Sequence, residues 1–162
     1  MDIRQATQDD VDGIVAIWND LITNTDVTFT TDLKTRDQIS AVLLDKADLG
    51  RPFFVAEDEG QIIGFATYGN FRNGSGYAHS MEHSIMLVPA AQGKGAGKQM
   101  MQILEDHAKR SGVHTFVGGI NSNNKQSIKF HEAIGYQTVG DIKQAGFKFG
   151  CWHDLVLMQK LL

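Results

Sequence analysis

The chain has 162 residues and a formal net charge of −4, with 15 Lys and Arg against 19 Asp and Glu. This length fits one domain, residues 1–162, which can bury a core without disulfides or metals. The acidic balance argues against nucleic acid or an anionic membrane as a partner. Hydrophobic residues never run long enough for a membrane span, and the first residues lack the plan of a signal peptide. A cytoplasmic protein is therefore expected, and the single Cys151 excludes an internal disulfide.

Two amphipathic helices are predicted at the start of the chain. Thr7–Asp10 has the form of a capping box and precedes apolar residues at helical spacing. Thr35–Gln38 repeats this signal before a second helix that ends near Gly50. Two strands, 53–57 and 61–68, then follow with a turn between them, which predicts a hairpin.

The second half of the chain alternates strands and helices. The pattern predicts a long strand at 77–88, a helix at 98–110, a strand at 113–120, a helix at 124–134, and a final strand pair at 136–142 and 152–159. No internal repeat or linker interrupts this order. The class is therefore α/β with a mixed sheet.

The segment Gln92–Lys98 is glycine-rich and lies between a predicted strand and a predicted helix. Glycines let the backbone approach a ligand and turn several N–H groups toward it, and the helix start adds partial positive charge, so the segment predicts a phosphate site. A Walker loop would need Gly and a hydroxyl where the chain has Gln92 and Gln99. A dinucleotide fingerprint would need Gly where it has Lys98 or Met100. Neither known loop fits.

His79, Glu82 and His83 match the spacing H-x-x-E-H, so a zinc peptidase is an alternative from another class. That motif requires a helix, whereas the flanking residues have strand character. On a strand, residues four apart lie about 13 Å from each other, too far for two ligands that each sit roughly 2.0 Å from one zinc ion. The zinc peptidase therefore remains a remote alternative.

Strand alternation places Glu82 and His83 on opposite faces, so the two cannot share one role. A carboxylate in the middle of an apolar central strand is desolvated, which raises its pKa toward the range of a general base. Glu82 is either such a base or an ion-paired structural carboxylate, and His83 is more simply a framework histidine. His131, on the helix 124–134, is a candidate acid for a departing thiolate, and backbone N–H groups near 85–87 can stabilise an oxyanion.

The pattern Gln-x-x-Gly-x-Gly resembles the pyrophosphate loop of the GNAT N-acetyltransferase superfamily. More narrowly, the chain resembles the phosphinothricin and methionine sulfoximine N-acetyltransferases along nearly its whole length. The resemblance rests on residues 3–7, 81–84, 92–97, 127–136 and 146–155. It implies a mixed, mostly antiparallel central sheet of about seven strands with about four helices, acetyl-CoA as the acetyl donor, and a homodimer.

The same resemblance implies roles for individual residues. Glu82 is implied as the base. The coenzyme is held by Ile85, Met86, Leu87, Gly93, Lys94, Gly95, Ala96, Gly97, Lys98, Asn124 and Ser127. The acceptor pocket is lined by Phe29, Arg72, Asn73, Gly74, Glu82, His83 and Ser84. Arg72 also has a physical case, because a guanidinium binds a carboxylate in a bidentate way.

The expected activity is transfer of acetyl to the α-amine of a small amino acid or analogue such as methionine sulfoximine, methionine sulfone or phosphinothricin. Direct attack in a ternary complex is the simpler mechanism, because the one thiol lies in the C-terminal segment. Phe29 and Met86 stand where the family tends to carry Trp and Tyr, which leaves the acceptor open. A peptide N-terminus, a polyamine or an aminoglycoside is the alternative acceptor, and a non-catalytic coenzyme sensor is a third reading.

Overall fold

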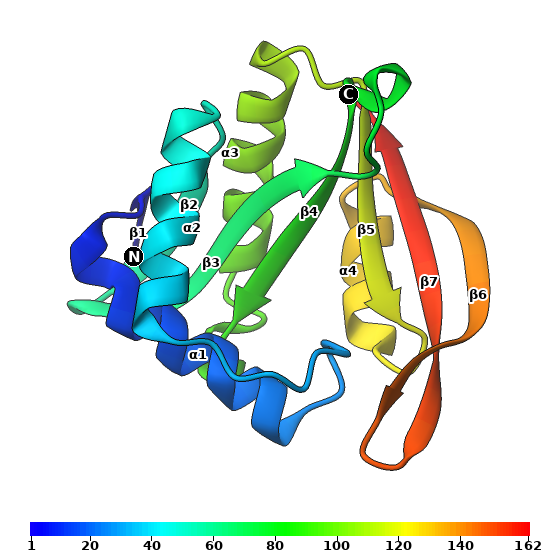
Figure 1. The fold of residues 1–162 in the computed structure, drawn as a ribbon, viewed down its shortest axis with the longest axis horizontal. Helices are drawn as coiled ribbons and strands as arrows, with labels where there is room; N and C mark the ends of the chain where they lie inside the picture. Colours follow the sequence, from blue (N-terminus) through cyan, green and yellow to red (C-terminus); the bar gives the residue numbers. More distant parts are fainter.

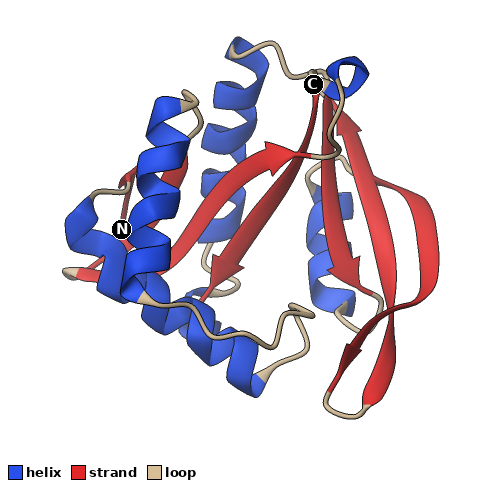
Figure 2. Cartoon of the chain, viewed as in Figure 1, coloured by secondary structure: helices blue, strands red, loops and turns tan.

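The computed structural model describes all residues, 1–162. Seven strands form one sheet in the order β1-β2-β3-β4-β5-β7-β6, and four α-helices pack against it (Figures 1 and 2). The strands are β1 (Asp2–Gln5), β2 (Phe53–Asp58), β3 (Gln61–Asn70), β4 (Ser80–Leu87), β5 (Thr115–Asn121), β6 (Gln137–Lys148) and β7 (Cys151–Leu161). All neighbouring strands are antiparallel except β4 and β5, which are parallel. The predicted α/β class and mostly antiparallel sheet are confirmed.

Helices cover both faces of this sheet (Figure 2). On one face, α1 (Val11–Asn24) and α2 (Arg36–Asp48) pack against β2 and β3 around the buried rings of Phe53 and Phe65. On the other face, α3 (Ala96–Arg110) and α4 (Lys125–Ala133) pack on the central strands around Phe116. The sheet is therefore buried on both sides at its centre, where the apolar runs of the sequence lie.

Several element boundaries differ from the sequence predictions. The strand β1 was not predicted, because it has only four residues and is fixed by pairing with β2, Asp2 opposite Glu57. The strand predicted from residue 77 begins at Ser80, since Ser75–Tyr77 forms a 3₁₀ turn. Strand β6 runs to Lys148 instead of ending near residue 142, with irregular register in between. Local propensity does not encode such tertiary pairing.

None of the helices combines the length and apolar character needed to cross a bilayer.

Candidate active site

The centre of the sheet splits where β4 and β5 separate. The two strands pair with each other only from Ser80 opposite Thr115 to His83 opposite Gly118. Both strands continue beyond that point, but no longer pair with each other. Figure 1 shows β4 and β5 together near the C-terminus and diverging toward α1. The gap is a cleft of about 620 Å³, lined by both strands, the loop before α3, α4 and the segment after α1. The split therefore opens a cavity in the middle of an otherwise continuous sheet.

The split leaves backbone groups of β4 without strand partners. Phe71 N–H donates to Ser80 O at 3.2 Å and Val88 N–H donates to Ile63 O at 2.9 Å, so the even-numbered residues of β4 bond to β3. Backbone direction alternates along a strand, so Ile85 and Leu87 direct their N–H and C=O groups toward the missing partner. These groups face the cleft, while the backbone of Met86 bonds to β3. Such N–H groups can hydrogen-bond an extended ligand or an oxyanion.

The glycine-rich loop adopts the conformation that its composition predicts. Gly93 and Gly95 have φ of 74° and 86°, and Gly95 is the N-cap of α3. The first intrahelical bond runs from Gln99 N–H to Gly95 O, so the N–H groups of the first turn are free. No acidic residue occupies that turn. The loop therefore has the geometry of an anion cradle at a helix start, with Lys98 among the residues that line the cleft.

Gly97 brings this cradle close to the rest of the site. A Cβ atom built on Gly97 would lie 3.2 Å from Leu87 Cδ1 and 3.4 Å from the ring of Phe130. The absent side chain lets the start of α3 pack tightly between β4 and α4. Helix α3 begins at Ala96, earlier than predicted, and Ala96 is buried beneath the loop. Lys94 is exposed and does not line the cleft.

Helix α4 supplies the far wall of the cleft. Asn124 caps it, since its Oδ1 accepts a hydrogen bond from Ser127 N–H at 3.0 Å. That bond leaves the amide NH₂ of Asn124 free for a ligand. Gln126 Nε2 donates to Gln92 Oε1 at 3.2 Å and joins α4 to the glycine loop. Asn124 and Ser127, both predicted, therefore lie across the cleft from the freed backbone of β4.

Glu82 lies beside the split, on the face of β4 that points toward α1. A Cβ atom built on Gly119 would be 3.1 Å from Glu82 Oε1, so the carboxylate leans across the neighbouring strand. Glu82 accepts no hydrogen bond and forms no ion pair, which excludes the alternative of an ion-paired structural carboxylate. Partial burial raises the pKa of Glu82 above its ordinary value of 4.5. A carboxylate that is unpaired, reachable and desolvated has the properties of a general base.

His83 and His131 lie on the other face of β4, stacked at 5.1 Å between ring centroids. Both nitrogens of His83 are buried without a partner, and burial lowers its pKa to about 3, so its ring is neutral. His131 Nδ1 lies 2.7 Å from Ser127 O, so Nδ1 carries the proton and Nε2 is bare. Burial also lowers the pKa of His131, and its Nε2 is closed to solvent. His83 is a framework residue, and His131 lines the cleft with its Nε2 closed to solvent.

Three comparisons with known proteins agree with this geometry. The model of the acetyltransferase (GNAT) domain matches residues 3–157. The chain belongs to the GNAT acetyltransferase family. An L-methionine sulfoximine/L-methionine sulfone acetyltransferase of Salmonella typhimurium is 36% identical over 159 residues, which cover 98% of this chain and 93% of the relative.

Two solved structures share the fold of this GNAT acetyltransferase over its full length. A ribosomal-protein-alanine N-acetyltransferase from Brucella melitensis has a TM-score of 0.96 and 38% identity, covering 100% of both chains. A phosphinothricin acetyltransferase from Sinorhizobium meliloti in complex with AcCoA has a TM-score of 0.94 and 31% identity, covering 99% of this chain and 88% of that one. The names of these relatives give three different acceptors. Family membership therefore shows acetyl transfer and leaves the acceptor open.

The structure of this GNAT acetyltransferase overturns the zinc peptidase alternative. His79, Glu82 and His83 lie on or beside a strand, with Glu82 and His83 on opposite faces. His79 Nδ1 instead bonds to Gly112 O at 2.7 Å. The helical geometry that the H-x-x-E-H motif requires is absent, so the spacing is coincidental.

The predicted acceptor residues of the acetyltransferase divide into two groups. Phe29, Glu82, His83 and Ser84 line the cleft. Arg72, Asn73 and Gly74 lie in the loop between β3 and β4, before the paired end of β4, and are absent from the cleft lining. The guanidinium of Arg72 lies 5.8 Å from the ring centre of Phe71. Their role in acceptor binding stays a prediction.

Sequence reasoning missed a further set of residues that line the acetyltransferase cleft: Leu21, Val27, Thr28, Gly118, Gly119, Ile120, Asn121, Gln126, Phe130 and Leu155. One signal was available, because two adjacent glycines inside a strand indicate close approach by neighbouring groups. A Cβ atom on Gly118 would lie 2.8 Å from His83 Nε2. Gly118 and Gly119 therefore make room for the two consecutive side chains of β4, one on each face.

Proposed function

We propose that this chain is an acetyl-CoA-dependent N-acetyltransferase that acts on the α-amine of a small amino acid or analogue. The observation that carries the proposal is the unpaired carboxylate of Glu82 at the point where β4 and β5 separate. Unpaired backbone groups of Ile85 and Leu87 lie on the same strand. A helix-start anion cradle follows a few residues later. Base, oxyanion donors and diphosphate site are the parts that acetyl transfer from a thioester to an amine requires.

The residues present fit acetyl-CoA as the donor. A Cβ atom on Gly97 would meet Leu87 and Phe130, so the start of α3 is packed close to the cleft. We assign the free N–H groups of Ala96, Gly97 and Lys98 to the diphosphate, with the Lys98 ammonium adding charge. The freed backbone of Ile85 and Leu87 would bond the pantetheine arm in strand-like fashion. The amide of Asn124 would reach the same arm from α4.

In the proposed reaction, Glu82 takes a proton from the acceptor ammonium, directly or through water. The neutral amine then attacks the thioester carbonyl in a ternary complex, and a backbone N–H of β4 stabilises the oxyanion. Cys151 supports no acyl-enzyme, because it is the first residue of β7 and lies outside the cleft lining, with Sγ 3.4 Å from Lys148 O. The role of His131 as the acid that protonates the departing thiolate stays a prediction. For this role its unprotonated Nε2 must first gain a proton, and its ring must rotate so that Nε2 faces the cleft.

The charge of the cleft lining favours a small amino acid over a polycation. Glu82 is the only carboxylate of the lining, and Lys98 is its only ammonium group. Polyamines and aminoglycosides need several carboxylates, whereas an amino acid brings one positive and one negative group. The Salmonella relative is named for methionine sulfoximine and methionine sulfone. The Brucella structure is named for ribosomal-protein alanine, so a peptide N-terminus is the second candidate.

An acceptor panel tests the proposal. Initial rates with acetyl-CoA are measured against methionine sulfoximine, methionine sulfone, phosphinothricin, spermidine and a peptide that begins with alanine. The sulfoximine or sulfone is expected to give the highest kcat/KM. A peptide that exceeds them would select the second candidate. Coenzyme binding without turnover on any amine would support the sensor reading instead.

The activity is expected to fall in acid through the titration of Glu82. The carboxylate is the active form, and partial burial raises its pKa above 4.5. kcat should therefore be retained above that raised pKa and lost as the pH falls through it. A profile of kcat between pH 4 and pH 9 in mixed buffers of constant ionic strength measures this limb. If the limb persists in Glu82→Gln, another group is responsible.

The expectations of a cytoplasmic location and a homodimer belong to this proposal as well. The β6–β7 hairpin exposes Phe147, Phe149 and Trp152, each more than half accessible in the single chain. Phe147 and Trp152 pack against each other at 5.0 Å. Exposed aromatic groups of this kind are typical of protein interfaces, which supports an assembly of two copies.

A further inference from the structure

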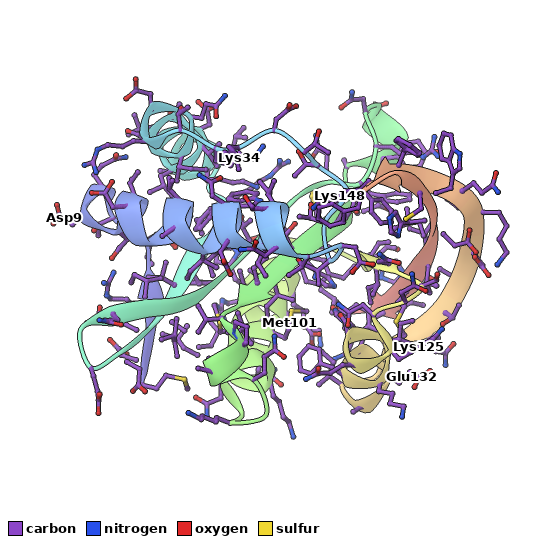
Figure 3. All side chains as sticks on the ribbon, turned by 90° about the horizontal axis from the view of Figure 1, so that it is seen from below. Asp9, Lys34, Met101, Lys125, Glu132 and Lys148 are labelled. Atoms are coloured by element: carbon purple, nitrogen blue, oxygen red, sulfur yellow. The ribbon has the colours of Figure 1, made fainter.

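One wall of the cleft is a loop held by a distant part of the chain. Residues 25–29, here called the acceptor loop, follow α1 and supply Val27, Thr28 and Phe29 to the cleft lining. The loop has no strand or helix of its own. Its contacts run to β5 and to the end of the β6–β7 hairpin, more than 90 residues later in the chain. Figure 3 shows Lys148 where this loop meets the hairpin.

Lys148 makes the strongest of these contacts. Its Nζ donates to Thr25 O at 2.7 Å and to Thr28 O at 2.8 Å, and its side chain is only 2% exposed. A lysine this buried requires hydrogen-bond partners, and here both are carbonyls of the acceptor loop. One ammonium therefore fixes both ends of the four-residue span 25–28. Val27, which lies within that span, points into the cleft lining.

Three further residues hold the same loop. Asn121 Nδ2 donates to Asp26 O at 2.8 Å. His153, which is 5% exposed, stacks on Phe29 at 5.6 Å, with its Nδ1 3.7 Å from Asp26 Oδ2. A Cβ atom on Gly146 would lie 2.3 Å from Phe29 Cδ2, so only glycine lets the ring rest on the hairpin. The position of Phe29 is thus determined from two sides.

We propose that Lys148, with Asn121, His153 and Gly146, is a positioning group that holds the acceptor loop and thereby sets which acceptor the enzyme binds. The inference rests on the proposed function, and it concerns the acceptor half of the cleft alone. It also gives a role to the segment 146–155, on which part of the family resemblance rests. The acceptor side chain would lie against Phe29 and Val27. Coenzyme binding, through β4, α3 and α4, does not depend on the loop.

The test replaces Lys148 with Met, which keeps the length of the side chain and removes its donors. KM for the best acceptor is expected to rise about tenfold or more, with kcat and the Kd of acetyl-CoA within about threefold of wild type. Hydrogen–deuterium exchange of residues 25–29 should become faster. Lys143→Met is the matched control on the same strand, because exposed Lys143 pairs only with Asp141 and Asp154. It should leave all these values unchanged.

The proposal is wrong if Lys148→Met keeps the acceptor KM of the wild type, whether or not exchange of the loop becomes faster. Gly146→Ala provides a second test if Lys148→Met does not fold. Its added methyl group must displace Phe29, so the ratio of kcat/KM between methionine sulfone and phosphinothricin should change by about threefold or more. An unchanged ratio would also overturn the proposal. If wild type acetylates no amino acid, the proposed function fails, and loop exchange in Lys148→Met still decides whether Lys148 anchors the loop.

Discussion

Replacing Glu82 with Gln is expected to lower kcat by about 10² to 10⁴-fold and to leave the Kd of acetyl-CoA nearly unchanged. Gln keeps the shape of the side chain above Gly119 but cannot accept a proton at neutral pH. The donor site that we propose lies along the backbone of β4, α3 and α4, so it does not depend on the carboxylate. Initial rates at saturating substrates measure the first effect, and calorimetric titration with acetyl-CoA measures the second.

Glu132→Gln is the matched control for this substitution. Glu132 is an exposed carboxylate on α4 with no hydrogen bond or ion pair, so the same chemical change there should leave kcat within about twofold of wild type.

Activity above pH 9 offers a second check, because a free amine needs no base. Part of the kcat of Glu82→Gln should return in alkali. Full activity of the variant at pH 7 would remove Glu82 from the mechanism.

The placement of Glu82 and His83 could be predicted from the sequence because it depends only on strand alternation. Ser84–Pro89 has strand character, and a period of two puts consecutive residues on opposite faces whatever the strand pairs with. The structure confirms this, with Glu82 partly exposed beside the split and His83 buried in the α3 side of the core. The glycine loop was predictable for a similar local reason. The conformations of Gly93 and Gly95 follow from their own backbone freedom.

The split between β4 and β5 could not be derived from local pattern. It depends on which strands are neighbours, and β5 lies about 30 residues after β4 in the chain. The extension of β6 to Lys148 was missed for a related reason. Register shifts between Ile142 and Gly146 break the alternation, and Gln144 has a positive φ of 52°. A bulge of this kind is stabilised by its partner strand, so the local sequence alone predicts a loop there.

The acceptor loop shows the same limit at the level of single residues. From the sequence alone, Lys148 is expected to be an ordinary exposed cation between two aromatic residues. Only the folded chain brings it to Thr25 and Thr28, more than 100 positions away. His153 and Asn121 were equally hidden, because each acts on Asp26 from a different strand. Long-range contacts of polar side chains have no periodic signal, whereas apolar faces do.

Replacing Gly95 with Leu is expected to raise KM and Kd for acetyl-CoA by about tenfold to a hundredfold while kcat at saturation changes little. Gly95 caps α3 with φ of 86°, a conformation that costs a residue with a side chain about 1–2 kcal/mol. The added side chain would also stand at the start of α3, whose free N–H groups we assign to the diphosphate. The loop must then shift or the ligand must withdraw, and either change weakens the anion cradle. Calorimetry with acetyl-CoA measures the loss directly.

Gly60→Leu separates strain from lost binding. Gly60 has a similar φ of 78° in the β2–β3 turn, and a Cβ there would meet nothing within 4 Å. Both variants should lower the melting temperature by comparable amounts, because both force a side chain into a left-handed conformation. Only Gly95→Leu should weaken acetyl-CoA binding, since Gly60 lies outside the cleft lining. If both variants bind acetyl-CoA as wild type does, the diphosphate is held elsewhere, and the free amides at the start of α3 do not hold the donor.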